Sequence, residues 1–383
     1  MLKVKLFTNI ASHYRSPIWK ELLNTDYFYT EFYFSRNKSL GIKEIDFNEK
    51  EFKENRSRLN IVKGLWFKEI LFWQFRVLSI CFFKYFDKAI FLGDAYCLST
   101  WIAATVCRLR RIDVIFWGHG LYDNENWFKK RFRILFFSLA DKHLLYERRA
   151  KKIMANERFD KDKLYVIFNS LDFNNHKVLR EKYKFIEKKN VFYKLPNPDY
   201  PIIIFIGRLT SAKRIDVLIE AALKINKKNV KINVVIVGDG IERKYLETIG
   251  KEGLDKGWLI FKGACYDEEQ NAKYLSAADL CVSPGNVGLT GVYSLTFGTP
   301  VATHDDMSNQ MPEADAIIEG SNGFFFKKNN SSNLAKKLEG WFSVNKDPNE
   351  LYKNCINIID TYYNPNYQLK VFKRILYNLP PKV

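Results

Sequence analysis

Two basic residues follow a very apolar stretch near the middle of the chain. The run PIIIFIG ends at Gly207, Arg208 comes next, and Lys213 lies five residues further on, at the predicted start of a helix. The N–H groups at a helix start attract phosphate, an arginine can grip a phosphate through two hydrogen bonds, and a lysine adds a point charge. The spacing is typical of an anion site, and a solvated basic helix start remains the alternative.

A second loop of this kind, SPGNVGLTGVYSLTFGTPV, runs from Ser283 to Val301 and carries no acid, base or thiol. Gly288, Leu289 and Thr290 stand at a predicted turn from strand to helix. A glycine there lets backbone N–H groups approach a ligand closely, so phosphate could be bound without any charged side chain. A tight turn needed only for packing is the alternative. Two such helix starts at strand carboxyl ends in one half favour phosphate binding.

The first half of the chain carries two further candidate loops. His119 follows a predicted strand in VIFWGHG, and ligands of doubly wound sheets bind beyond strand carboxyl ends. This position favours a site role for His119, as a positioning group or hydrogen-bond donor, over a structural one. The loop TNIASHYRSPIW follows the first strand, and its His13, Arg15 and Ser16 are candidates for binding an acceptor polyol or pyrophosphate. An exposed polar loop that starts a helix at Ser16 is the alternative.

Short apolar runs alternate with helical patterns in both halves, which predicts parallel β-α-β units. In the first half the predicted strands are Lys3–Thr8, Thr30–Phe34, Lys88–Leu92, Asp113–Trp117, His143–Tyr146 and Leu164–Phe168. The pattern restarts at Pro201 with a run apolar enough for a strand buried on both faces. The predicted fold class is α/β, with two Rossmann-like doubly wound domains. We expect domains over 1–171 and 201–363, a linker over 172–200, and a C-terminal helix over 364–383 that packs on the first domain.

Composition narrows the function classes. The chain has 383 residues, of which 47% are hydrophobic, and this is enough for two packed domains. The net charge of +18 suits a phosphorylated substrate, an anionic membrane surface or a nucleic acid, or reflects genome composition. No nucleic-acid module is recognisable, so no nucleic acid is expected. The six cysteines lack zinc spacing and no signal peptide is evident, which predicts a cytoplasmic protein without a bound metal or cofactor.

One aromatic stretch, Gly64 to Phe86, is too interrupted by charge for a membrane span. Glu69, Arg76 and Lys84 recur at steps of seven and eight, which predicts a helix with a narrow charged stripe. A buried helix is one interpretation. The other is a surface helix that enters a bilayer interface.

Taken in order, five stretches of the second half resemble the donor-binding domain of GT-B glycosyltransferases, in particular the large retaining group called family 4. They are GRLTSAKRIDVLIEA, VVIVGDG, FKG, AADLCVSP leading into VGLTGVYSLTFGTPV, and MPEADAIIEGSNGFFF. The first half resembles the family more faintly, through VIFNSLD and the histidine of WGHG. The resemblance implies a GT-B fold, in which two Rossmann-like domains face a central cleft.

The resemblance also assigns roles. Arg208 and Lys213 are implied to bind the donor diphosphate and to stabilise the departing nucleotide, without a divalent metal. His119 is implied to lie near the donor sugar and the acceptor, as the third catalytic residue. The other implied donor-binding residues are Gly207, Asn286, Gly288, Leu289, Thr290 and Tyr293.

The chain departs from the family at two positions. Family members usually carry two glutamates eight positions apart, of which the first contacts the donor sugar and the second the ribose. Gly285 and Tyr293 stand at the matching places. We expect Tyr293 to hydrogen-bond or stack on the ribose. Gly285 is expected either to leave room or to leave the sugar to be held by other residues, for which Asn286 is a candidate. Glu313, in MPEAD, matches a common family acid and is predicted to be structural.

These observations predict a glycosyltransferase that uses a UDP- or GDP-linked sugar and a glycan acceptor, expected to be lipid-linked. The expected setting is synthesis of a bacterial surface polysaccharide (capsule, O-antigen or lipopolysaccharide), with peripheral attachment to the inner face of the cell membrane. A non-catalytic GT-B protein that binds a glycan or a partner is the main alternative, because both glutamates are missing. A nucleotide-sugar epimerase of the same fold is another alternative.

Overall fold

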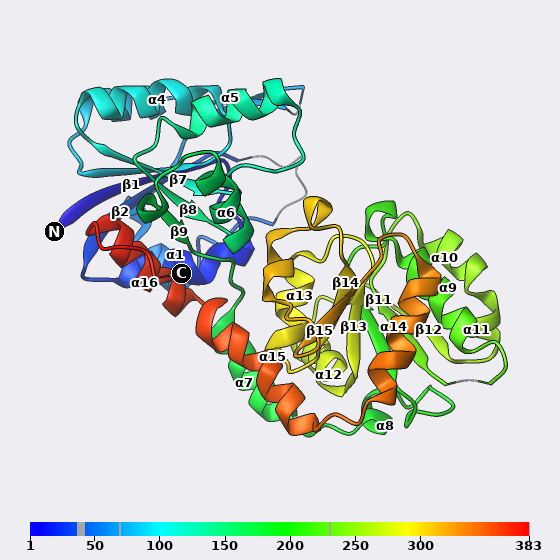
Figure 1. Cartoon of the computed structure of the whole chain (residues 1–383). Helices are drawn as coiled ribbons and strands as arrows, with labels where there is room; N and C mark the ends of the chain where they lie inside the picture. Colours follow the sequence, from blue (N-terminus) through cyan, green and yellow to red (C-terminus); the bar gives the residue numbers. More distant parts are fainter. Residues whose placement is uncertain (37–42, 69, 230, 383) are drawn as a thin grey trace. The chain divides into compact units, whose positions relative to one another are not determined.

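The structure is a computed structural model, and it describes residues 1–36, 43–68, 70–229 and 231–382. The chain divides into two compact units (Figure 1). The first unit combines residues 1–172 with 362–383, and the second comprises residues 173–361. Each unit contains one parallel sheet with helices, which confirms the predicted α/β fold class.

The first unit is built on a seven-stranded parallel sheet in the order β3-β2-β1-β6-β7-β8-β9. The strands are β1 Leu2–Thr8, β2 Phe28–Phe34, β3 Leu59–Ile61, β6 Lys88–Leu92, β7 Asp113–Gly118, β8 Lys142–Leu145 and β9 Leu164–Val166. All six strands predicted for this half are present. The edge strand β3 was missed because three residues are too few to show a hydrophobic period.

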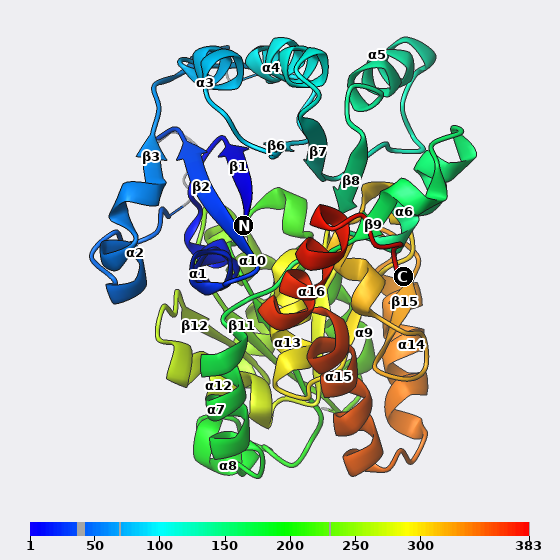
Figure 2. The ribbon, with the colours of Figure 1, turned by 90° about the vertical axis from the view of Figure 1, so that its left-hand side faces the viewer.

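Helices cover both faces of this sheet (Figures 1 and 2). On one face lie α3 (Val77–Phe83), α4 (Leu98–Leu109) and α5 (Trp127–Phe137), whose buried residues form one core with the sheet. On the other face lie α1 (Ser16–Asn24) and α16 (Pro365–Leu376), which share a second core. The first unit also contains the helices α2 (Lys50–Glu54) and α6 (Arg148–Asn156).

The helix predicted across Gly64 to Phe86 is wrong. The segment forms an antiparallel hairpin, β4 (Gly64–Phe67) with β5 (Leu71–Gln74), and only then the helix α3. Side-chain exposure alternates along both strands. The two-residue repeat of a β-strand therefore determines the local structure, and the helical spacing of the three charged residues does not. Arg76 has a φ of 66°, which a continuous helix excludes, and Glu69 lies outside the described residues.

The second unit is built on a six-stranded parallel sheet in the order β12-β11-β10-β13-β14-β15. The strands are β10 Ile202–Ile206, β11 Asn233–Val237, β12 Leu259–Gly263, β13 Leu280–Ser283, β14 Val301–His304 and β15 Gly323–Phe326. The helices are α9 Ile215–Ile225, α10 Arg243–Ile249, α11 Lys251–Asp255, α12 Glu268–Ala277, α13 Gly288–Thr296, α14 Ser331–Ser343 and α15 Pro348–Tyr362. The central strands β10 and β11 are continuous apolar runs, as strands covered on both faces should be.

The segment 172–200, expected as a linker, contains two helices of the second unit, α7 (Phe173–Tyr183) and α8 (Lys188–Val191). Helix α7 is fixed there by Arg180, whose buried guanidinium donates to both carboxylate oxygens of Asp360, at 2.9 and 3.1 Å. The C-terminal helix α16 lies in the first unit, where the side chain of Gln368 bonds Ser170 and the Phe168 carbonyl.

Within the described residues, no helix is long and apolar enough to cross a membrane.

Each sheet has a topological switch point, at which the direction of strand addition reverses. In the first unit it lies between β1 and β6, and in the second between β10 and β13. Ligands of such sheets bind outside the strand carboxyl ends at this point. The loops that leave these four strands therefore define where a site should be sought.

Candidate functional site

In the second unit, the loop after β10 begins with a close approach of two strand ends. A Cβ atom on Gly238 would lie 1.9 Å from the carbonyl oxygen of Gly207. The φ angles of Gly207 and Gly238 are 152° and 153°. Only glycine fits such a contact. The loop after β10 is thereby held against the end of β11, and Arg208 follows immediately.

Arg208 and Lys213 form a cationic pair at this switch point. Arg208 is exposed, and its side chain makes no hydrogen bond or ion pair with any residue that the structure describes. The Nζ atom of Lys213 donates to the backbone oxygen and to Oδ1 of Asn286, both at 2.9 Å. Burial lowers the pKa of Lys213, the nearby Arg208 charge lowers it further, and Glu313 partly offsets both effects. An anion bound between the two cations would relieve this repulsion.

The loop after β13 presents the N-terminus of α13. Gly288 has a φ of 49°, and a Cβ atom there would meet nothing within 4 Å, so the backbone is open to solvent. The Val287 N–H donates to Oε1 of Gln310 at 3.0 Å, and the Thr290 hydroxyl donates to the Ile206 carbonyl at 3.2 Å. The Thr290 bond ties the helix start to the end of β10, and the Val287 bond ties it to the segment after β14. The first N–H groups of a helix lack intrahelical partners and point outward, where an anion can accept from them.

Gln310 was missed by sequence reasoning. Its Nε2 atom donates to the Thr303 hydroxyl at 2.8 Å and to the His304 carbonyl at 3.0 Å, while its Oε1 holds the loop before α13. The residue thus joins the ends of β13 and β14. No local pattern marks a single glutamine for this task.

Gly285 does not leave room, contrary to expectation. Its N–H donates to the Lys213 carbonyl at 3.0 Å, and a Cβ atom there would lie 2.0 Å from the Ala212 oxygen. The turn that carries Lys213 fills the space that a side chain would need. Asn286 is engaged with Lys213, so its amide oxygen serves to position that lysine.

Tyr293 is held in a cluster of its own. Its hydroxyl donates to Oε2 of Glu268 at 2.6 Å, and its ring lies 5.0 Å from the ring of His176. His176 Nε2 lies 3.1 Å from the same carboxylate oxygen. Burial and the Glu268 carboxylate raise the pKa of Tyr293. The phenol is therefore a neutral donor already engaged with Glu268, which sequence reasoning had not singled out.

Glu313 is buried in the short helix Pro312–Ala316. That helix packs against α13, and the carboxylate acts on Lys213 through its charge.

In the first unit, a cavity of about 450 Å³ opens at the switch point between β1 and β6. The strand-end loops of β1, β6, β7 and β8 all contribute to it. Its lining includes Asn9, Ser12, Tyr14, Arg15, Asp94, His119, Lys129, Arg133 and Tyr146. Of the three predicted acceptor residues it contains Arg15. His13 is exposed and Ser16 is buried at the start of α1, and neither lines the cavity.

Arg15 is held in an aromatic cage inside this cavity. Its guanidinium carbon lies 4.9 Å from the ring centre of Trp117, and 5.5 Å from those of Tyr14 and Tyr146. It also donates to the Tyr146 hydroxyl. No carboxylate pairs with Arg15 among the described residues, so its charge is balanced only by aromatic faces and phenol oxygens.

His119 and Asp94 face the same cavity with opposite pKa shifts. Burial, with the charges of Arg15 and Arg133, lowers the pKa of His119 to about 4. The imidazole is therefore neutral near pH 7 and has one donor and one acceptor nitrogen. Burial raises the pKa of Asp94, whose Oδ1 accepts from the Tyr96 N–H at 3.0 Å. Sequence reasoning missed Asp94, although GDAY follows a predicted strand in the same way as WGHG.

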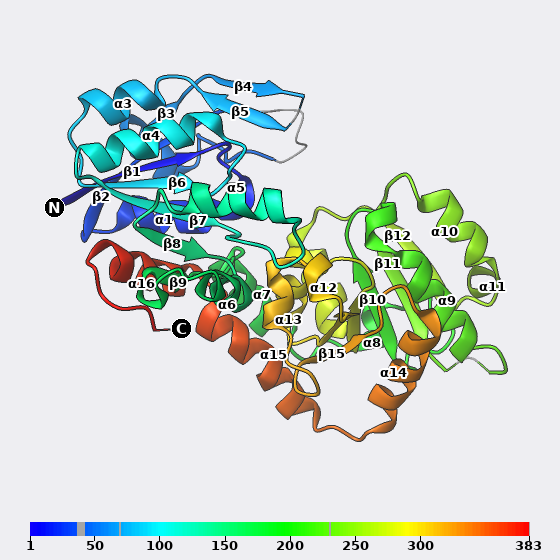
Figure 3. The same ribbon diagram turned by 45° about the horizontal axis from the view of Figure 1, so that its top comes forward.

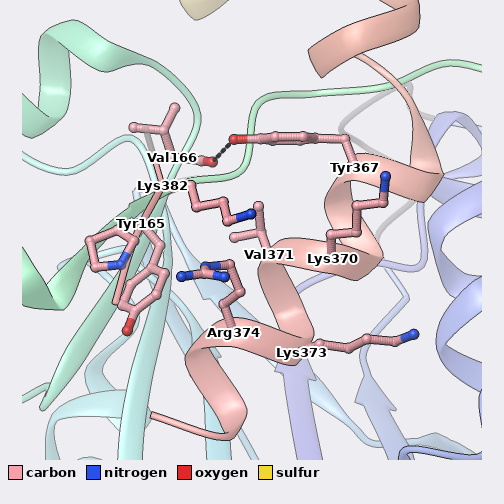
Figure 4. A pocket seen from close by; sticks show the side chains of 9 residues that line it. Tyr165, Val166, Tyr367, Lys370, Val371, Lys373, Arg374 and Lys382 are labelled. Carbon is pink, nitrogen blue, oxygen red and sulfur yellow. Dashed lines mark hydrogen bonds between the residues drawn. The ribbon is translucent and has the colours of Figure 1, made fainter. Parts of the chain in front are cut away.

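A second, smaller cavity of the first unit, of about 240 Å³, lies between α16 and β9 (Figure 4). Lys370, Lys373, Arg374 and Lys382 contribute to its lining, and the Tyr367 hydroxyl donates to the Val166 carbonyl at 3.1 Å. This cavity lies beside α16, away from the switch point.

Within the described part of the chain, no group of three or more His, Cys, Asp or Glu side chains has a metal-binding arrangement.

Comparison with known proteins agrees with this geometry. Residues 187–358 match the family model for glycosyl transferases group 1. Across 98% of the chain, the structure superposes on the Anabaena protein HepE in complex with UDP, with a TM-score of 0.67 and 13% identity over 100% of that protein. It likewise superposes on the lipopolysaccharide outer core galactosyltransferase WaaB, with a TM-score of 0.68, 15% identity and coverage of 98% and 99%. These two structures define the fold as GT-B.

The sequence also has curated relatives. A glycogen synthase of Thermosipho africanus is 30% identical over 198 residues, which is 46% of this chain and 40% of that protein. An uncharacterized glycosyltransferase of Methanocaldococcus jannaschii is 28% identical over 207 residues, half of each chain. The aligned part thus spans half or less of these relatives. The chain has the GT-B fold, and its residues 187–358 match the family model for glycosyl transferases group 1.

Proposed function

We propose that the protein is a glycosyltransferase that moves a sugar from a UDP- or GDP-linked donor to a glycan acceptor. The observation that carries the proposal is the Arg208–Lys213 pair beside the N-terminus of α13, at the β10/β13 switch point. The proposed acceptor is a lipid-linked glycan, and the proposed setting is bacterial surface-polysaccharide synthesis on the cytoplasmic face of the membrane. Two structural neighbours support this choice, HepE in complex with UDP and the lipopolysaccharide outer core galactosyltransferase WaaB.

The proposed chemistry follows from where charge develops. When the bond between the anomeric carbon and the diphosphate breaks, negative charge grows on the leaving diphosphate oxygens. Arg208, Lys213 and the first N–H groups of α13 are fixed donors that stabilise this charge without reorganisation. In this proposal the cations replace a divalent metal. Since no carboxylate nucleophile is assigned, we propose that retention arises by front-face attack through an oxocarbenium-like state.

The first-unit cavity is the proposed acceptor site. A neutral His119 can donate one hydrogen bond and accept another, as a sugar hydroxyl requires. Asp94 adds an acceptor, and Arg15 adds a cation without an acidic partner, which favours an acceptor with an anionic group near the reacting sugar.

A nucleotide-sugar epimerase is the second candidate, because the structure also superposes on the UDP-GlcNAc 2-epimerase of Neisseria meningitidis. The TM-score is 0.61 and the identity 16%, over 98% of this chain and 100% of that one. The family match of residues 187–358 favours transfer. Product analysis separates the two, since an epimerase returns an intact nucleotide sugar.

The testing experiment follows UDP-glucose, UDP-N-acetylglucosamine and GDP-mannose by NMR, with and without EDTA. The proposal predicts that one donor releases its nucleoside diphosphate, that the transferred or hydrolysed sugar keeps its anomeric configuration, and that EDTA changes nothing. Arg208→Ala should abolish this release, while Lys336→Ala on α14, an exposed lysine distant in sequence from both loops, should not. An epimerised nucleotide sugar would replace the proposal with the second candidate. No turnover with any donor would favour a non-catalytic binding protein.

A further inference from the structure

Helices α3, α4 and α5 form an outer layer of the first unit (Figure 3). The outer surface of this layer exposes large apolar side chains. On α4, Leu98, Ile102 and Leu109 follow one another at steps of four and seven, so they lie on one outward stripe. The opposite side of α4, which includes Ala103 and Cys107, is fully buried.

Helix α5 repeats this arrangement. Phe128, Phe132 and Leu135 are exposed and follow at steps of four and three. The two helices are neighbours, because the Trp101 ring of α4 lies 5.1 Å from the Phe132 ring of α5. Helix α3 packs against α4 and adds Phe82 and Phe83 at its end. We call the outward surface of α3, α4 and α5 the aromatic face.

The helices of the aromatic face carry cations and no acids of their own. The sequences of α3, α4 and α5 contain no aspartate or glutamate, while α4 carries Arg108 near its end and α5 carries Lys129, Lys130 and Arg131. Lys129 and Lys130 pair with Glu125 and Glu157 of neighbouring segments. Lys84 follows α3 directly. Exposed aromatic and aliphatic side chains beside cations are the composition of a surface that enters the headgroup region of an anionic bilayer.

A helix of the second unit shows what an ordinary solvent face looks like. Helix α9 also covers a parallel sheet, but its outward stripe is Asp216, Glu220 and Lys224, at steps of four. This stripe mixes both signs of charge and exposes no large apolar side chain. The composition of α4 is therefore not a requirement of covering a Rossmann-like sheet.

We propose that the aromatic face docks on an anionic lipid bilayer, with the side chains of α3, α4 and α5 inserted among the headgroups. The inference goes beyond the proposed activity, since lipid binding requires no turnover. The net charge of +18 strengthens attraction to such a surface but does not identify which face of the protein binds it. The exposed apolar stripes of α4 and α5 identify that face.

The test measures flotation of the full chain with two kinds of vesicle, phosphatidylcholine alone and phosphatidylcholine mixed equally with phosphatidylglycerol. The apolar variant changes the most exposed residue of each helix, Phe83→Ser, Leu109→Ser and Phe128→Ser, at 76%, 80% and 79% exposure. The matched control changes three equally exposed residues of the second unit, Phe185→Ser, Ile241→Ser and Tyr266→Ser, at 82%, 86% and 94%. All six side chains are largely in solvent, so both variants should fold.

A second pair of variants separates a specific face from general charge. Lys84→Gln with Arg131→Gln removes two cations from the aromatic face. Lys370→Gln with Lys382→Gln removes two cations from the α16 cavity, on the opposite side of the sheet (Figure 4).

The proposal predicts flotation with phosphatidylglycerol vesicles that falls at least about tenfold in the apolar variant and several-fold in the Lys84/Arg131 variant. The control triple and the Lys370/Lys382 variant should float as the unchanged protein does. Equal losses in both charge variants with no loss in the apolar variant would overturn the proposal in favour of unspecific charge. Absent flotation would also overturn it, as would a dimer in light scattering that only the apolar variant abolishes. The last result would assign the face to a second copy of the chain.

Discussion

The two switch points of this molecule use the same topology but different materials. In the second unit the site is made largely of backbone: glycines at strand ends and the start of α13, joined by the exposed Arg208 and by Lys213, which Asn286 holds. In the first unit the site is made of side chains: a caged arginine, a neutral histidine, a buried carboxylate and several tyrosines.

Under the proposed function, this difference follows from what each site would recognise. A diphosphate presents the same oxygens in every nucleotide sugar, so a fixed set of N–H groups and cations suffices. An acceptor presents a particular pattern of hydroxyl and charged groups, and such a pattern has to be matched by particular side chains. Changes in the second unit should therefore act on all donors alike, and changes in the first unit should act on acceptor use.

The largest effect is expected from Lys213→Ala. Removing one fixed donor from developing charge costs about 10² to 10³ in kcat, so turnover should fall by that amount with every donor. The check is steady-state turnover beside Lys336→Ala, which removes an equal charge from α14. A variant that keeps more than about a tenth of the activity would remove Lys213 from the machinery.

Gly285→Glu tests the backbone character of the donor site. Although the family resemblance places a glutamate at this position, the new Cβ would lie 2.0 Å from the Ala212 oxygen. We expect a loss of about 1 to 3 kcal/mol in stability and weaker nucleotide binding, because the turn that carries Lys213 must move. Gly340→Glu on α14 is the control, since a Cβ there meets nothing within 4 Å. Equal melting temperatures for the two variants would contradict the packing described for Gly285.

His119→Ala probes the side-chain site of the first unit. It should lower kcat about tenfold or more and leave nucleotide affinity unchanged, because a neutral imidazole acts here as a positioning hydrogen-bond group. His13→Ala, outside the cavity, should leave both values unchanged. If calorimetry shows that His119→Ala weakens nucleotide binding instead, the proposal that the second unit binds the nucleotide and the first unit binds the acceptor would be wrong.

The depressed pKa of His119 also predicts a pH dependence of stability. The imidazole has a pKa of about 4 in the folded protein against about 6.5 when unfolded, so the unfolded chain binds the extra proton first. The stabilisation is complete above pH 6.5 and is lost as the pH falls toward 4. Denaturant unfolding at pH 7 and pH 5 should show a smaller decrease for His119→Gln than for the unchanged protein. Identical decreases would place the imidazole in solvent.

The smallest effect is expected from Tyr293→Phe. The hydroxyl donates to Glu268, so its loss should cost about 1 kcal/mol in stability and leave nucleotide affinity nearly unchanged. Tyr266→Phe, on an exposed ring, is the comparison. A large drop in nucleotide affinity would indicate that the Tyr293 hydroxyl binds the ribose, as the sequence analysis predicts.

Much of this architecture was readable in the sequence, because buried parallel strands are long apolar runs that need no partner to be recognised. The cationic pair was found for the same reason, since Arg208 and Lys213 directly follow such a run. The hairpin at Gly64–Gln74 was lost because three charges at helical spacing hid an alternation of period two.

The supporting residues of the site could not be predicted. Gln310, Glu268 and Asp94 act through partners that are distant in sequence or through burial, and neither is visible in a local pattern. The surroundings of Gly285 could not be predicted either. The missing side chain suggested empty space, but the fold shows that the Ser211–Lys213 turn occupies this space.

The most direct test of the donor site is calorimetric titration of UDP and GDP into the unchanged protein and into Arg208→Ala, at two salt concentrations. The Arg208 side chain is exposed and makes no hydrogen bond or ion pair within the described chain, so its removal should leave folding intact and act mainly on the bound ligand. We predict micromolar binding of one of the two nucleotides, weakened at least about a hundredfold by Arg208→Ala. Equal affinity in both proteins, or no binding to either nucleotide, would contradict a diphosphate site at the β10/β13 switch point.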